Sequence, residues 1–181
     1  MAWPQAATAS HLPSRFFRWS RTLKLILGAD HAGYQLMDLL RPMVEEMALV
    51  VATIGAHSAD EPVDYPDIAV EVAKALREGV AERAVIICGS GVGAVMACNK
   101  QAGLYAGLCH DTYSARQGVQ HDNMNVVCMG ARIVGVEVAR DVIRQFLGAS
   151  FGNEERHLRR FRKMQDLETS GRNAGRTELE Q

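Results

Sequence analysis

The chain has 181 residues, the size of one ordinary domain, and 48% of them are hydrophobic while 23% are charged. Its 20 basic and 21 acidic side chains leave a net charge of −1, without the basic excess that is typical of proteins binding nucleic acid or acidic membranes. No apolar run approaches the roughly 20 residues that span a bilayer, so a membrane protein is not expected.

The two ends of the chain differ in composition from its middle. Residues 1–21 carry three arginines and no acidic residue, as organelle transit peptides do, although a disordered extension of a cytoplasmic protein is the interpretation we favour. From about residue 169 the sequence is polar and predicts a frayed tail. We therefore expect one folded domain over residues 22–168, with disordered ends at 1–21 and 169–181.

Short apolar runs alternate with amphipathic segments along the domain. The runs predict buried strands over 23–29, 48–55, 84–88, 104–109 and 125–131. The helical spacing of apolar residues predicts a helix after each strand, with a kink or a late start of the first helix at Pro42 and the second helix opening at Pro66. Such alternation predicts a single doubly wound, Rossmann-like α/β domain with a five-stranded parallel sheet, followed by an extra basic C-terminal helix over 154–166.

In a sheet of this kind, ligands bind beyond the carboxyl ends of the strands. Polar and titratable residues gather in the loops expected there: Asp30, His31, Asp64, Tyr65, the run Cys88–Gly93, His110, Asp111, His121, Asp122 and Arg132. Among the histidines, we favour ligand-binding roles for His31 and His121, whereas His110 could simply be exposed and His157 is expected to be solvated. This clustering at one edge of an apolar scaffold is typical of an enzyme.

The run CGSGVG, from Cys88 to Gly93, is the sharpest local feature. Gly89, Gly91 and Gly93 let the backbone turn tightly and aim successive N–H groups, together with a helix start, at an anion. The same surroundings favour the reactive thiolate of Cys88, although a small buried residue at the end of a strand is an equally good interpretation. A rival interpretation is the dinucleotide fingerprint G-x-G-x-x-A, with Asp111 about twenty residues on, but it would lie in the third βα unit rather than the first.

The other cysteines, Cys98, Cys109 and Cys128, are expected to be packing residues. The chain contains neither a CxxC pair nor a disulfide framework, so we expect a reduced protein without a structural zinc site. In the basic C-terminal helix, Arg156 and Arg160 are four residues apart and share a face, which suits a phosphate group.

Taken together, these segments resemble the type B ribose-5-phosphate isomerases and the galactose-6-phosphate isomerase subunits. The resemblance covers residues 23–165, and its segments follow the order of the family: GADHAG (28–33), DYPD (64–67), ICGSGVG (87–93), CNK (98–100), YSA (113–115), QHDNMNV (120–126), GAR (130–132) and RHLRR (156–160). It implies an aldose–ketose isomerase of a phosphorylated sugar that needs neither metal nor organic cofactor.

The resemblance also implies roles for individual residues. Cys88 would move a proton between C2 and C1 through a cis-enediolate. Some relatives use a glutamate six residues further on instead, but this chain has Ala94 there, so the cysteine is the expected base. Ser90 and the N–H groups of residues 89–93 would hold the developing oxyanion, and His121 would open the furanose ring. The remaining positions would bind the substrate, with Asp30 at the sugar hydroxyls and His31, Arg132, Arg156 and Arg160 at the phosphate, while Tyr65 would line the pocket.

One departure from the family pattern concerns the substrate. Many members have asparagine after the histidine, where this chain has Asp122, and a carboxylate there changes which hydroxyls are favoured. Ribose 5-phosphate is the expected substrate, with galactose 6-phosphate, allose 6-phosphate and a tetrulose phosphate as alternatives. The resemblance further implies a homodimer or tetramer in which the neighbouring subunit supplies the loop of His121. A nucleotide-binding module and a sugar-phosphate sensor without catalysis are the alternatives from other classes.

Overall fold

The structure is a computed structural model that describes residues 23–177, with the side chains of residues 23–170. Five strands and six helices follow one another as β1 Lys24–Ala29, α1 Tyr34–Met47, β2 Leu49–Gly55, α2 Tyr65–Arg77, β3 Arg83–Cys88, α3 Val92–Cys98, β4 Ala106–Leu108, α4 Thr112–Asp122, β5 Val126–Gly130, α5 Val136–Gly148 and α6 Glu155–Thr177. The segment predicted to be an extension or transit peptide, 1–21, lies outside the described residues. The domain boundaries at 22 and 168 stay predictions.

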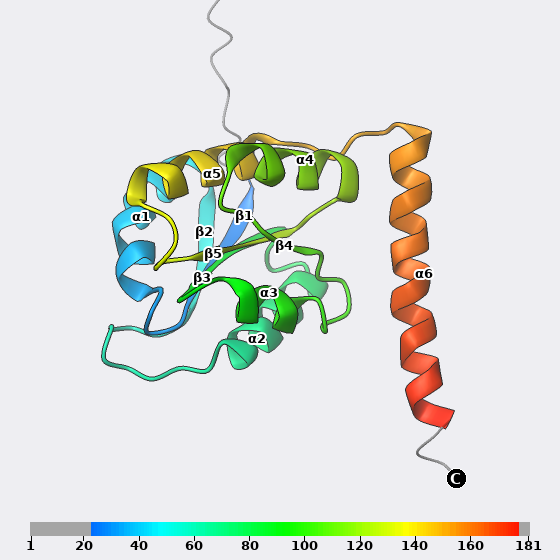
Figure 1. The fold of residues 1–181 in the computed structure, drawn as a ribbon, viewed down its shortest axis with the longest axis horizontal. Coiled ribbons are helices and arrows are strands. Elements are labelled where there is room, and N and C mark those ends of the chain that lie inside the picture. The colour runs from blue at the N-terminus through cyan, green and yellow to red at the C-terminus, as the bar shows by residue number, and fades with distance from the viewer. Residues whose placement is uncertain (1–22, 178–181) are drawn as a thin grey trace, which may run out of the picture.

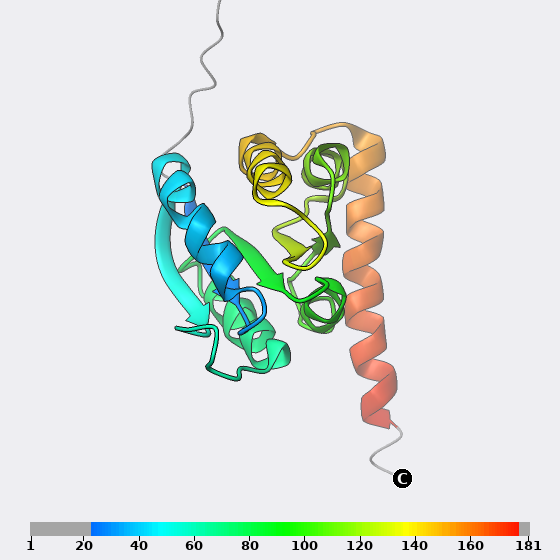
Figure 2. The same cartoon turned by 60° about the vertical axis from the view of Figure 1, so that its left-hand side comes forward.

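The strands form one parallel sheet in the order β2-β1-β3-β5-β4, which confirms the predicted doubly wound α/β fold. Helices α1, α4 and α5 pack on one face over a core that includes Leu40, Val119 and Phe146. Helices α2 and α3 cover the other face over a second core around Ile68 and Ile86. Figure 2 shows the sheet between these two helical layers. The central strands β1, β3 and β5 are buried on both faces, as their uninterrupted apolar runs predict.

Helix α6 runs alongside the domain, starting near the end of α4 (Figure 1). Phe161 anchors it, with its ring 4.9 Å from that of Tyr105 and 5.5 Å from that of Phe151 between centroids. Two helical turns after Phe161, the Glu168 carboxylate accepts a hydrogen bond from the Gly103 N–H at 2.7 Å. These contacts dock α6 on the outer edge of the sheet, next to β4.

The largest differences from the predictions concern Pro42, β4 and α6. Pro42 lies inside α1, which begins at Tyr34, so the late start is wrong, while the kink stays a prediction. Pro42 and Asp38, whose carbonyl lacks its usual N–H donor, are both exposed to solvent. Strand β4 is only three residues long, and the Asn99 side-chain amide binds the N–H and C=O of Ala106 on its open edge, each at 2.9 Å. Helix α6 continues to Thr177, well past its predicted end at Asp166.

Candidate functional site

The carboxyl ends of the parallel strands bring most of the predicted site residues together. We call this group the strand-end cluster: Asp30, His31, Tyr65, Cys88, Ser90, His110 and Arg132. Each follows or ends a strand, or begins the helix after one, so the topology delivers them to the same edge of the sheet. This edge is where the sequence predicts the ligand to bind.

The turn after β3 is built around the thiol of Cys88. The Gly91 N–H donates a hydrogen bond to the Cys88 sulfur at 3.1 Å, and the Val92 N–H donates to the Ser90 hydroxyl oxygen at 3.3 Å. Gly91 has φ +80°, in the left-handed region that glycine adopts without steric cost, and this reversal allows α3 to begin at Val92. Cys88 is only 4% exposed. The turn therefore presents a thiol and a hydroxyl on a rigid loop.

Tyr65 lies against this turn because Gly93 has no side chain. A Cβ atom at Gly93 would lie 2.6 Å from the Tyr65 ring, so only glycine leaves room for it. Tyr65 opens α2 from the other side of the site, and its ring remains partly exposed. The contact brings an aromatic wall to within van der Waals distance of the loop that carries Cys88.

Asp30 is one of two buried charged or polar residues among those described, at 7% exposure. Its carboxylate accepts a hydrogen bond from the Gly33 N–H at 2.9 Å, and its own N–H donates to the Ile87 carbonyl at 3.3 Å. The second bond ties the end of β1 to β3, one residue before Cys88. His31, the next residue along the chain, is exposed to solvent.

Arg132 reaches the same turn from the loop after β5. A Cβ atom at Gly89 would lie 3.5 Å from the Arg132 guanidinium, and the Arg132 N–H donates to the Gly89 carbonyl at 3.0 Å. One residue earlier, the Ala131 N–H donates to the Cys88 carbonyl at 2.8 Å. The strand-end cluster thus holds a thiol, a buried carboxylate and a guanidinium around one loop.

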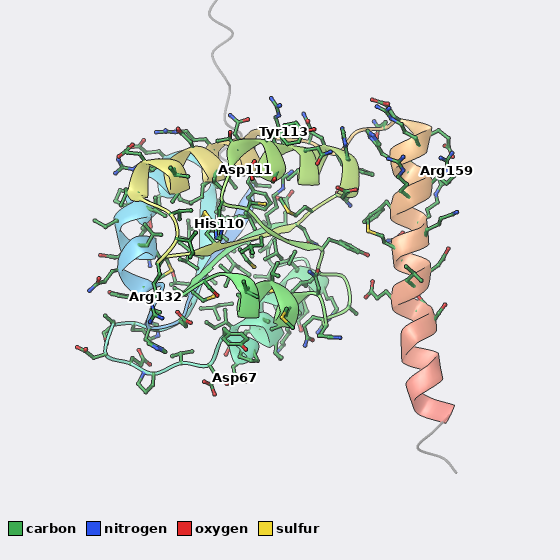
Figure 3. The ribbon with its side chains drawn as sticks, viewed as in Figure 1. Asp67, His110, Asp111, Tyr113, Arg132 and Arg159 are labelled. Carbon is green, nitrogen blue, oxygen red and sulfur yellow. The ribbon has the colours of Figure 1, made fainter. Side chains whose placement is uncertain are left out.

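Residues at the end of α4 and in the first turns of α6 form a second group, away from the strand ends. We call this the helix-end cluster: His121, Asp122, Arg156, His157 and Arg160. Helix α4 starts at the strand ends and runs eleven residues back along the sheet, so Asp122 lies about 15 Å from Thr112. Figure 3 shows Arg159 of α6 far from Arg132. Within one chain, His121, Asp122, Arg156 and Arg160 therefore lie apart from Cys88.

His157, which the sequence predicts to be solvated, is instead buried at 2% exposure. Its ring stacks on that of His121 with the centroids 4.1 Å apart, and its Nδ1 atom has no hydrogen-bond partner among the described residues. Burial, together with the nearby His121, lowers the pKa of His157. A neutral imidazole thus supports His121 from one side. Because His157 stands among Arg156, Arg159 and Arg160, the sequence predicts a solvated helix face and gives no sign of this burial.

The three other cysteines are buried and free, as their apolar surroundings predict. Burial, with a smaller contribution from Asp111, raises the pKa of Cys109 to about 11. A hydrogen bond with Cys98 and burial raise the pKa of Cys128 well above its ordinary value. Within residues 23–177, the His, Cys, Asp and Glu side chains form no group of three that could hold a metal ion, and no helix there is long and apolar enough to cross a membrane.

Comparisons with known proteins agree on one group. A family model described as Ribose/Galactose Isomerase matches residues 25–164. The chain is 38% identical over 131 residues to D-erythrulose-4-phosphate isomerase 2 of Mycolicibacterium smegmatis, covering 71% of this chain and 86% of the relative. It is also 38% identical over 128 residues to ribose-5-phosphate isomerase B of Escherichia coli, covering 71% and 85%. The solved type B ribose 5-phosphate isomerase of Trypanosoma cruzi superposes with a TM-score of 0.78 at 38% identity, covering 83% of this chain and 99% of that one.

Proposed function

Since the chain belongs to the ribose/galactose isomerase family and is thus a sugar-phosphate isomerase, we propose that it interconverts ribose 5-phosphate and ribulose 5-phosphate by proton transfer through Cys88. The observation that carries this proposal is the turn of residues 88–93, which holds a thiol beside a hydroxyl and a set of backbone N–H groups. The cysteine chemistry and the choice of substrate are the parts that go beyond family membership.

In the proposed reaction, the Cys88 thiolate removes the proton from C2 of the open-chain aldose and returns it to C1. The electrons of the broken C–H bond form an enediolate, whose negative charge develops on the C1 oxygen. The proton of the C2 hydroxyl then moves to that oxygen, and as the Cys88 thiol gives its proton to C1 the C2 carbonyl of the ketose forms. Ser90 and the N–H groups of Gly89 and Gly93 would stabilise this charge, which is usually the largest contribution to such catalysis. The Gly91 N–H, which donates to the Cys88 sulfur, would stabilise the thiolate instead. Asp30 is buried at the end of β1, and its N–H bonds to Ile87, the residue before Cys88. Its carboxylate would accept hydrogen bonds from the sugar hydroxyls.

We further propose that the complete site is shared between two copies of the chain. His121, which would open the furanose ring, and Arg156 and Arg160, which would bind phosphate with His31 and Arg132, lie in a different cluster from Cys88. A homodimer, or a tetramer of dimers, joins the strand-end cluster of one copy to the helix-end cluster of the other. Dilution to monomers is then expected to abolish activity, and full activity of an isolated monomer would contradict the shared site.

A tetrulose phosphate is the strongest alternative substrate. Two relatives are named D-erythrulose-4-phosphate isomerases, and one of them matches this chain at the same 38% identity as the relative named for ribose 5-phosphate. Asp122, where asparagine is usual in the family pattern, adds a carboxylate beside His121 and so beside the proposed substrate. Galactose 6-phosphate and allose 6-phosphate are longer alternatives that would need more room at the same site.

The test is proton exchange at C2, followed by NMR in deuterated water over a panel of aldose phosphates. Wild-type protein should exchange the C2 proton of one sugar rapidly, and Cys88→Ala should abolish this exchange without loss of the folded state. Cys98→Ala serves as the matched control, because Cys98 is also a buried thiol but lies at the last residue of α3, away from the turn of residues 88–93. Near-normal exchange by Cys88→Ala would reject the cysteine mechanism. Exchange on erythrose 4-phosphate alone would show that the substrate is the tetrose phosphate and not ribose 5-phosphate.

A further inference from the structure

His110 occupies a fixed place at the carboxyl end of β4, where the sequence suggests only an exposed residue. Both of its neighbours are anchored: the Cys109 N–H donates to the Cys128 carbonyl at 3.0 Å, and the Asp111 carboxylate caps α4 by accepting from the Ser114 N–H at 2.7 Å. Figure 3 shows His110 beneath the start of α4, at the strand ends where Arg132 also lies. The imidazole therefore projects from a short, rigid link into the strand-end cluster.

The side chain of His110 takes the place of a backbone acceptor of β4 beyond the end of its pairing with β5. The Ala131 N–H bonds to Cys88 of β3, so the preceding N–H, that of Gly130, faces the β4 side. Regular pairing of β4 with β5 ends at Leu108 and Cys128, and the Gly130 N–H donates instead to the His110 Nε2 atom at 3.1 Å. Because Nε2 accepts this bond, the ring proton must be on Nδ1.

The residue that His110 holds begins the turn that braces the Cys88 loop. Gly130 is the register partner of Cys88, and a Cβ atom at Gly130 would lie 2.6 Å from the Ser90 carbonyl carbon and oxygen. The turn of residues 130–132 then makes its two backbone bonds to the Cys88 and Gly89 carbonyls and carries the Arg132 guanidinium to Gly89. A shift of the Gly130 amide is thus passed directly to the backbone of the loop that holds the thiol.

We propose that His110 is a positioning residue for the isomerisation: by accepting the Gly130 N–H it fixes the 130–132 turn, and through that turn the placement of Cys88 and Arg132. This inference rests on the proposed function for its kinetic consequence but not for the hydrogen bond itself. The imidazole acts through Gly130 and does not exchange protons with the substrate. Its loss should therefore act mainly on kcat, with only a small rise in KM, because Arg132 is one of several proposed phosphate ligands while Cys88 is the one proposed base.

A pair of neutral variants tests the role of the Nε2 acceptor. Glutamine places its side-chain oxygen at about the reach of Nε2, whereas asparagine is one bond shorter, so His110→Gln should keep the bond and His110→Asn should lose it. We expect His110→Asn to lower kcat about tenfold or more, which corresponds to one lost hydrogen bond, with KM within about twofold, while His110→Gln keeps most of the activity. The amide exchange rate of Gly130, measured by NMR, should rise in His110→Asn only.

Several outcomes would overturn the proposal. They are an unchanged kcat in His110→Asn, an equal loss in the two variants, or a change confined to KM, which would make His110 a substrate-binding residue instead. In the wild-type protein alone, an unprotected Gly130 amide would refute the bond even if a variant failed to fold. Wild-type protein that isomerises none of the sugar phosphates would refute the proposed function, while the Gly130 exchange rates would still decide whether His110 holds this turn.

Discussion

Gly91→Ala is the substitution for which the structure predicts the largest local cost in the turn that holds Cys88. The new residue would have to adopt φ +80°, which costs an L-residue about 1–2 kcal/mol. Its Cβ atom would also lie 2.5 Å from a methyl group of Leu108, and 2.9 Å from the backbone carbonyl carbon of Met129, which has little freedom to move. Overpacking of this kind adds about 1–3 kcal/mol, so we expect the free energy of unfolding to fall by about 2–5 kcal/mol.

Two other glycines separate these contributions, and urea denaturation of the three alanine variants measures them. Gly79 has φ +70° with nothing within 4 Å of its missing Cβ, so Gly79→Ala should show the backbone cost alone, about 1–2 kcal/mol. Gly135 combines a φ of −76° with open space, so Gly135→Ala should cost no more than about 1 kcal/mol, the penalty for alanine as the N-cap of α5. Equal destabilisation by Gly91→Ala and Gly79→Ala would refute the claim that Gly91 is packed too closely for a side chain.

Three further predictions address a helix end, a buried histidine and the substrate. Arg83→Met should cost about 2–3 kcal/mol by removing a guanidinium that binds the last carbonyls of α5, while the exposed Arg144→Met should cost under about 0.5 kcal/mol in the same denaturation assay. Burial lowers the pKa of His157 below 6.5, so the unfolded chain takes up this proton before the folded one as the pH falls, and stability is lost below about pH 6.5. His157→Phe should therefore show a smaller drop in Tm than the wild-type protein between pH 7.5 and 5.5. An equal drop in the two proteins would contradict this. His121→Gln should lower kcat/KM for ribose 5-phosphate more than for erythrose 4-phosphate, whose phosphorylated O4 cannot close a furanose ring; equal losses would reject ring opening as the role of His121.

The sequence predicts the fold well because its signals are local. Each central strand is a short apolar run, and each helix repeats apolar residues at helical spacing, so the order of elements and the parallel sheet follow directly. The edge strand β4 is predicted too long, since its ends depend on Asn99 and on pairing with β5, which are tertiary contacts. The late start considered for α1 at Pro42 is wrong for the same reason, because the cost of the proline depends on which face of α1 meets solvent.

The candidate site is predictable in part. Cys88, Asp30 and Arg132 follow from the rule that loops at the carboxyl ends of parallel strands form the site, and that rule also singles out the position of His110. The bond from Gly130 to His110 could not be foreseen, since it depends on where pairing between β4 and β5 stops. The burial of His157 was equally hidden, because its partner His121 is distant in the sequence and the intervening residues say nothing about how α6 docks on α4.

The direction of α4 gives the proposed shared site a consequence for mixtures of defective chains. Because α4 carries His121 away from Cys88, the His121 of each copy would contribute to the site that contains the Cys88 of its neighbour. A chain with Cys88→Ala and a chain with His121→Gln are then each defective as homodimers, yet together they complement one another. One of the two sites in every mixed dimer would have both groups intact, so random reassortment of equal amounts should restore about a quarter of the wild-type sites.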